Sequence, residues 1–160
     1  MGSQQLLAIG SIFLITMLAI NFFTSNTNQL EVSVSNEALI SATGIAQGMI
    51  DNILTRAFDE KTVSGSVSSA SSLTPSGNLG PDAGENNVYK FDDIDDFKNY
   101  SAVDSSTRLS SYNISVDVKY VVNLNPENTS FSPTFVKRID VSISGQYLTD
   151  TLTLSHIVTY

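Results

Sequence analysis

The sequence lacks cysteine and tryptophan, and it has one histidine among its 160 residues. Without cysteine there are no disulfide bonds and no thiolate-ligated metals, and the redox compartment stays open. With His156 alone, metal or catalytic sites built from several histidines are excluded as well. Since no serine lies in a recognisable nucleophile motif, we expect no enzymatic activity and no cofactor, and a structural role for His156.

Basic residues are scarce: 8 Lys and Arg stand against 16 Asp and Glu, which gives a net charge of −8. Such a chain does not attract a phosphate backbone, so no nucleic-acid partner is expected. The first basic residue is Arg56. Signal peptides and ordinary membrane anchors carry Lys or Arg beside their apolar run. We therefore expect that a basic leader has been removed before Met1.

Charge is also missing from the long apolar segment Leu6–Phe23, which three polar residues interrupt. As a helix rising about 1.5 Å per residue, this segment would be roughly 27 Å long, close to the ~30 Å hydrocarbon core of a bilayer. Residues 1–24 are therefore predicted to form a hydrophobic transmembrane helix. Residues 24–35 are rich in Ser, Thr and Asn, which compete for backbone hydrogen bonds, so the helix is expected to loosen there.

Helical periodicity returns after the polar interval. Apolar residues recur at three- and four-residue steps, which predicts an amphipathic continuation of the helix over residues 25–60 with its apolar stripe facing a core. The stripe consists of Ala38, Leu39, Ala42, Ile45, Ala46, Met49, Ile50, Ile53, Leu54, Ala57 and Phe58.

Residues 61–160 are predicted to form a globular head that begins with a Ser/Gly-rich loop at residues 62–88. Alternating apolar residues then predict strands at residues 114–123, 136–144 and 148–160, with a turn at residues 125–128. Neighbouring strands with short connections favour an antiparallel sheet within residues 112–160. Its apolar face needs a cover, and the helix stripe is the one long candidate. The predicted fold class is α+β, with the hydrophobic half of the helix protruding.

A greasy N-terminal helix that continues into an amphipathic half packed on an antiparallel sheet resembles the type IV pilin and pseudopilin family. Met1 is similar to the first residue of mature chains in that family. Gln5 stands where many members carry Glu, and an amide can still accept a hydrogen bond from the terminal amine of a neighbouring subunit, without the charge. The Asp-rich stretch Phe91–Phe97 and the closing pattern after Val136 also resemble segments of pilin-like proteins.

This resemblance implies a structural subunit of an extracellular type IV pilus-like filament, or fimbrium, that serves adhesion, motility or aggregation. The expected partners are copies of the chain, a prepilin peptidase, the pilus assembly machinery of the inner membrane, and the cell membrane before assembly. Two alternatives stay open: a pseudopilin or minor pilin of a secretion or pilus machine, and a monomeric, single-pass anchored extracytoplasmic binding domain. The expected assembly residues are Met1, Gln5, Leu6, Leu7, Ile9, Ile12, Phe13, Ile15, Leu18, Ile20, Phe22 and Phe23.

Two further kinds of site are visible in the sequence. The acidic run Asp92, Asp93, Asp95 and Asp96 is a candidate for Ca²⁺, but its spacing does not match an EF-hand loop, so a solvated acidic turn is the favoured interpretation. Three N-x-Ser/Thr sequons are candidates for glycosylation. They begin at Asn99, Asn113 and Asn128, and we expect Asn128 in a loop to be the best acceptor.

Overall fold

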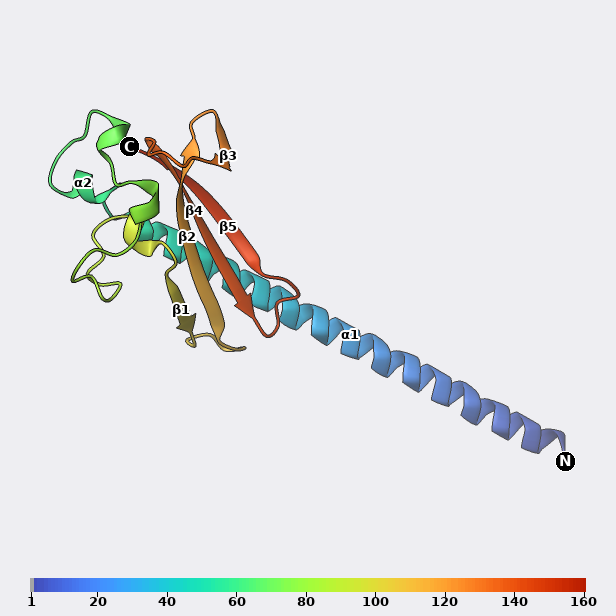
Figure 1. The fold of residues 1–160 in the computed structure, drawn as a ribbon. Helices are drawn as coiled ribbons and strands as arrows, with labels where there is room; N and C mark the ends of the chain where they lie inside the picture. The colour runs from blue at the N-terminus through green and yellow to red at the C-terminus, as the bar shows by residue number, and fades with distance from the viewer. Residues whose placement is uncertain (1) are drawn as a thin grey trace. The chain divides into compact units, whose positions relative to one another are not determined.

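The computed structural model describes residues 2–160 and has an α+β fold: one long N-terminal helix and a five-stranded antiparallel sheet (Figure 1). Contacts along the chain divide it into two units, Met1–Glu37 and Ala38–Tyr160, and each is described by itself. The helices are α1 (Ser3–Ile53) and α2 (Glu60–Val63), and the 3₁₀ turns are η1 (Ala70–Ser72), η2 (Ser76–Asn78) and η3 (Asp95–Phe97). The strands are β1 (Ser101–Asp104), β2 (Tyr112–Val122), β3 (Asn125–Thr129), β4 (Val136–Gly145) and β5 (Leu152–Thr159).

In the first unit the chain is helical from Ser3 onward, and the expected loosening at residues 24–35 does not occur. The hydroxyl of Thr24 donates to the carbonyl of Ile20 at 2.9 Å, and that of Thr27 donates to the carbonyl of Phe23 at 2.9 Å. These bonds run back along the helix to residue i−4. The side chains therefore add to the helical hydrogen bonds instead of competing with them.

In the second unit, the end of α1 packs on the sheet. Buried alanines at four-residue steps (Ala38, Ala42 and Ala46, each 0 % exposed) allow the helix to approach closely, and the Tyr112 hydroxyl donates to the Ala38 carbonyl at 3.2 Å. Ile50 continues this line. Ala42, Ala46 and Ile50 share one core with apolar residues of β2 and β4, as the amphipathic stripe predicted. Leu39 and Leu54, which were assigned to the same stripe, are exposed instead.

The sheet runs in the order β1-β2-β4-β5, and β3 pairs with the end of β2. The three long strands confirm the predicted antiparallel arrangement, and Val118 lies opposite Ile139 in the register of β2 with β4. The structure corrects three of the strand predictions. The last strand begins at Leu152 and not at residue 148. The segment predicted as a turn at residues 125–128 forms β3, because the chain folds back and Thr129 pairs with Val121. The short strand β1 was not predicted, since four residues carry too little alternation to be recognised.

The predicted extension of the helix to residue 60 is wrong, because α1 ends at Ile53. Beyond it the backbone of Ala57 pairs with the Asp-rich segment: its N–H donates to the Asp92 carbonyl at 3.0 Å, and its carbonyl accepts from the Ile94 N–H at 2.9 Å. A helical residue could not offer both groups to another segment. The predicted Ser/Gly-rich loop contains η1 and η2, and Leu73 anchors it in a second apolar cluster with Phe58.

Candidate functional site

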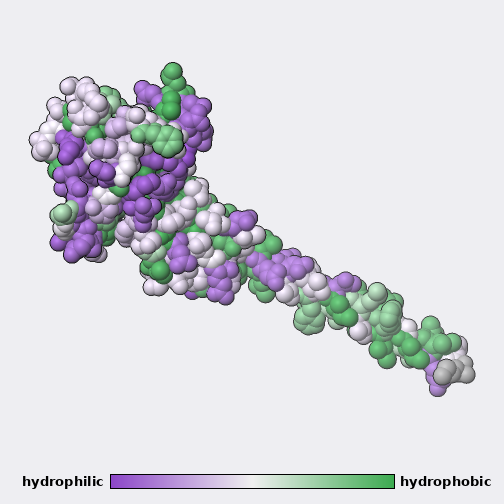
Figure 2. All heavy atoms as spheres, viewed as in Figure 1, coloured by the Kyte–Doolittle hydropathy of each residue, from purple (hydrophilic) through white to green (hydrophobic). Residues whose placement is uncertain are grey.

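The first candidate site is the apolar surface of the N-terminal unit. The segment predicted to span a membrane lies within α1, and its large apolar side chains are exposed, from Met17 at 55 % to Leu7 at 74 %. Figure 2 shows hydrophobic colouring gathered along this unit. Among the described residues, one helix is long enough and apolar enough to cross a membrane, and that helix is α1. All the predicted assembly residues from Gln5 to Phe23 are exposed, and Met1 lies outside the described residues.

Two hydroxyl groups within the apolar segment are hydrogen-bonded to the helix backbone. Ser11 Oγ donates to the Ala8 carbonyl at 2.9 Å, and Thr16 Oγ1 donates to the Ile12 carbonyl at 2.8 Å. A polar group in an environment without water is costly unless it is hydrogen-bonded. These two residues are therefore compatible with lipid or with the interior of a helix bundle.

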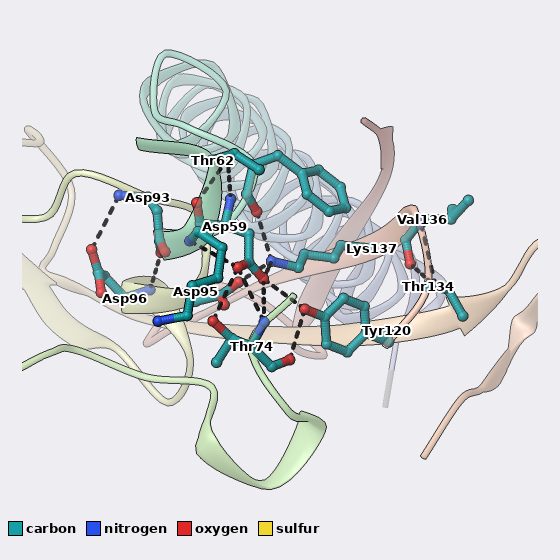
Figure 3. Close-up of polar contacts among 12 residues, drawn as sticks. Asp59, Thr62, Thr74, Asp93, Asp95, Asp96, Tyr120, Thr134, Val136 and Lys137 are labelled. Atoms are coloured by element: carbon teal, nitrogen blue, oxygen red, sulfur yellow. Dashed lines mark hydrogen bonds and ion pairs between the residues drawn. The ribbon is translucent and has the colours of Figure 1, made fainter. Parts of the chain in front are cut away.

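The second candidate site is a buried polar cluster in the head, formed by Asp59, Asp95 and Lys137 (Figure 3). Lys137 Nζ contacts Asp95 Oδ1, and it donates to Asp59 Oδ2 at 3.1 Å and to the Phe58 carbonyl at 2.6 Å. The side chains of Lys137 and Asp59 are 0 % exposed. Nζ also lies 4.5 Å from the centre of the Phe58 ring and 4.9 Å from that of Tyr120.

Asp59 is held in place from several sides (Figure 3). The Tyr120 hydroxyl donates to its Oδ2 at 2.7 Å, while the backbone N–H and the hydroxyl of Thr74 donate to its Oδ1 at 3.1 and 3.0 Å. Asp59 is also the N-cap of α2, where Oδ1 accepts from the Lys61 N–H and Thr62 accepts from the Asp59 N–H. The cluster thus connects the segment after α1, the Ser/Gly-rich loop and the sheet.

The two carboxyl groups that face Lys137 have pKa values shifted in opposite directions by their surroundings. Burial raises the pKa of Asp59, but the hydrogen bond from Tyr120 and the charge of Lys137 outweigh it, and the result is a pKa of about 2. Burial dominates at Asp95 and raises its pKa to about 7, against the lowering effect of Lys137. Near neutral pH, Asp59 is therefore the ionised partner of Lys137, and both the acid and the carboxylate forms of Asp95 are populated.

The interpretation of the acidic run as a solvated turn is wrong, because Asp93, Asp95 and Asp96 are at most 2 % exposed. Asp96 Oδ2 accepts from the N–H of Asp92 at 3.0 Å and of Asp93 at 3.2 Å, which folds the run back on itself. The structure does not bring the four together as one ligand set, since Asp95 turns to Lys137.

A different set of three carboxylates does come together, and it includes two members of the acidic run. Oxygens of Glu85, Asp92 and Asp96 lie within 4.8 Å of one another. Burial and the charge of Asp93 raise the pKa of Asp96 to about 7, and burial together with Glu85 raises the pKa of Asp92. Proton retention by these carboxyl groups relieves their mutual repulsion.

Sequence reasoning missed the buried cluster, although the sequence carries one signal for it. Lys137 lies two residues before Ile139, so it is in phase with the core-facing residues of its strand, and Tyr120 is in phase with the core-facing residues of β2. The two are cross-strand partners. A lysine in the apolar phase of a strand indicates a buried cation that needs an acidic partner. Nothing local identifies Asp59 as that partner.

The remaining predicted sites are on the surface of the head. Asn99, Asn113 and Asn128 are all exposed, and Asn128 lies in β3 instead of a loop. Asn99 has a positive φ of 60°, a conformation that asparagine tolerates better than most residues. His156 is half-buried on β5, opposite Ile139.

The carboxyl groups predict a stability maximum at mildly acidic pH. Asp93, Asp95 and Asp96 have raised pKa values of about 7 in the folded chain, against an ordinary value of 3.8. Between these values the folded chain keeps protons that the unfolded chain has lost, so the free energy of unfolding falls as pH rises from about 4 through about 7. Asp59, with its pKa of about 2, acts oppositely, and its contribution is lost as pH falls below about 4.

Guanidinium unfolding of the full chain in detergent, measured between pH 3 and pH 8, tests this expectation. The neutral variant Asp96→Asn should reduce the slope on the neutral side, because it removes one of the three titrating groups. A free energy of unfolding that rises steadily from pH 4 to pH 8 would contradict the assignment of these carboxyl groups as buried acids.

Comparison with family models, with curated proteins and with solved structures found no match. The functional conclusion therefore depends on the features of the chain itself.

Proposed function

We propose that the protein is anchored in a membrane through α1 and acts as a structural subunit there. More particularly, we propose a type IV pilin-like subunit that polymerises through its N-terminal helix into an extracellular filament. The observation that carries the proposal is the apolar surface of Leu6–Phe23, on which every large apolar side chain is exposed. The protein has no enzymatic role in this proposal.

The energetics support a change of environment from bilayer to filament. Exposed large apolar side chains along the whole segment are more than a soluble surface tolerates. Burial at about 25 cal/mol per Å² would stabilise such a helix among copies of itself by tens of kcal/mol relative to water. Relative to lipid the gain is smaller and depends on close packing, which Ala8, Gly10 and Ser11 permit because they are small.

Shearing surface appendages from cells that express the chain, followed by negative-stain microscopy and mass spectrometry, tests the proposal. We expect filaments whose most abundant protein is this chain. Filaments that contain the chain only as a trace component would favour a minor pilin or pseudopilin. A chain found in the membrane fraction alone, with no filament, would favour the anchored binding domain.

Gln5 provides a finer test of the assembly mechanism. Its side chain is exposed, and its backbone N–H donates to the Gly2 carbonyl at 3.0 Å. Gln5→Leu removes an acceptor for a neighbouring subunit's terminal amine and should lower filament yield several-fold. Gln4→Leu, at the adjacent exposed position, is the matched control. Equal yields from both variants and the wild type would refute a role for the amide.

A further inference from the structure

An amine, a carboxyl group and a second carboxylate meet in the closed interior of the head. Lys137 Nζ contacts Asp95 Oδ1 and lies 3.1 Å from Asp59 Oδ2. The residues are 0 % (Lys137, Asp59) and 2 % (Asp95) exposed. The rings of Phe58 and Tyr120 lie against Nζ and keep bulk water from it. Figure 3 shows the three polar side chains converging from separate segments of the chain.

From this arrangement we infer that Lys137 and Asp95 become joined by an intramolecular amide bond, with Asp59 carrying the protons. Asp59 takes a proton from the Lys137 ammonium group, and the freed amine attacks Cγ of the Asp95 acid. The C–N bond forms as the C=O π-bond opens onto oxygen. Asp59 then protonates the hydroxyl group, the C–O bond breaks, and water leaves. Asp59 finally takes the surplus proton from the amide nitrogen and passes it to solvent.

Three physical features favour this condensation over a lasting ion pair. Groups held in contact react with effective concentrations of about 10⁵ M or more when well oriented. The burial that raises the pKa of Asp95 to about 7 also keeps a substantial fraction of its carboxyl group in the acid form that an amine can attack. Asp95 Oδ2 is buried and accepts no hydrogen bond from the residues that the structure describes, and loss of one Asp95 oxygen as water reduces the number of acceptors to be satisfied.

Asp59 has the properties that a proton carrier needs. The Tyr120 hydroxyl and Thr74 fix its carboxylate, so that Oδ2 faces Nζ. Asp59 and Asp95 both contact the same nitrogen, Lys137 Nζ, which places the carrier beside the reacting carboxyl group. The resulting bond would connect η3 to β4, two elements 42 residues apart in the chain, and it rests on no property of the N-terminal helix.

The head contains an internal control with the same two functional groups. Lys98 Nζ lies 2.5 Å from Asp117 Oδ1, but these side chains are 25 % and 42 % exposed. Asp117 is also contacted by Lys119 at 3.3 Å instead of by a second buried carboxylate. Water reaches this pair, and among the described residues no buried carboxylate is fixed beside it as a proton carrier. We therefore expect Lys98 to keep its free amine.

Tryptic digestion of the folded full chain, followed by tandem mass spectrometry, tests the inference. Trypsin does not cleave after an acylated lysine, so residues 91–98 should appear joined to residues 120–138, with the mass of one water missing. Cleavage after Lys98 in the same branched peptide reports that the control lysine is free. A linear peptide ending at Lys137 and a full-mass peptide 91–98 as the main products would overturn the inference. A succinimide at aspartate also loses water, but it leaves the peptides linear.

Variants test separately the reacting group Asp95 and the proton carrier Asp59. Asp95→Ala should abolish the branched peptide, and Asp59→Asn should abolish or strongly reduce it while both reacting groups remain. Tyr120→Phe, which removes the hydroxyl that holds Asp59, should form the branched peptide more slowly than the wild type. Circular dichroism establishes that each variant is folded. A fully branched, folded Asp59→Asn chain would overturn the role of Asp59, and full-rate branching in Tyr120→Phe would overturn the positioning argument if Asp59→Asn does not fold.

Discussion

Replacement of Lys137 by methionine is expected to lower the free energy of unfolding by about 3–5 kcal/mol, because removal of one partner from a buried ion pair leaves an uncompensated charge. The charge left behind is that of Asp59, which is 0 % exposed and has a pKa of about 2 when Lys137 is present. Guanidinium unfolding of the full chain in detergent, followed by circular dichroism, measures the loss. In a chain where Lys137 is already joined to Asp95, the substitution removes the cross-link instead of the ion pair, and the loss is again several kcal/mol.

Lys98→Met is the matched control for that experiment. Lys98 also contacts an aspartate, but on the surface, where an ion pair is worth about 0–1 kcal/mol. The two methionine variants should therefore differ several-fold in their effect on stability. If Lys137→Met were as mild as Lys98→Met, the buried cluster would not be a major source of stability for the head.

A double substitution Ile12→Asp/Ile15→Asp is expected to abolish filaments altogether. Both side chains lie on the exposed apolar surface, at 65 % and 66 % exposure, within the segment proposed to pack among copies of itself. An unpaired charge in a dry apolar bundle costs several kcal/mol, and the cost would recur in every subunit. Counting filaments by electron microscopy, alongside the amount of chain in the membrane fraction, measures the effect.

Ser25→Asp/Asn28→Asp provides the control for the acidic double variant. It adds the same two charges to the same helix at three-residue spacing, but in the polar interval where both residues are already exposed. We expect it to assemble. Filaments of normal length from the Ile12→Asp/Ile15→Asp chain would exclude the apolar segment as the assembly surface.

Elements set by local pattern could be predicted from the sequence. The long apolar run, the stripe that ends α1 and the alternation in β2, β4 and β5 each repeat over enough residues to reveal their period. The exposure of Leu6–Phe23 on a helix is likewise what the length of this segment and its lack of charge predict.

Elements set by distant partners could not be predicted. The helix ends at Ile53 because the backbone of Ala57 pairs with Asp92 and Ile94, far along the chain. The polar interval is helical, with the hydroxyls of Thr24 and Thr27 turned back onto the helix, an outcome that composition alone does not specify.

The sequence by itself determined the separation of a charge-free apolar helix from a polar α+β head, because hydrophobic period and charge are local properties. Only the tertiary structure decided which acidic residues leave water. Asp59 and Asp95 meet Lys137 across 78 and 42 residues, and Asp92 beside them stays exposed. The physical reason is that a carboxylate is buried where a distant cation and donors compensate its lost hydration. That compensation exists only once the strands and loops have come together.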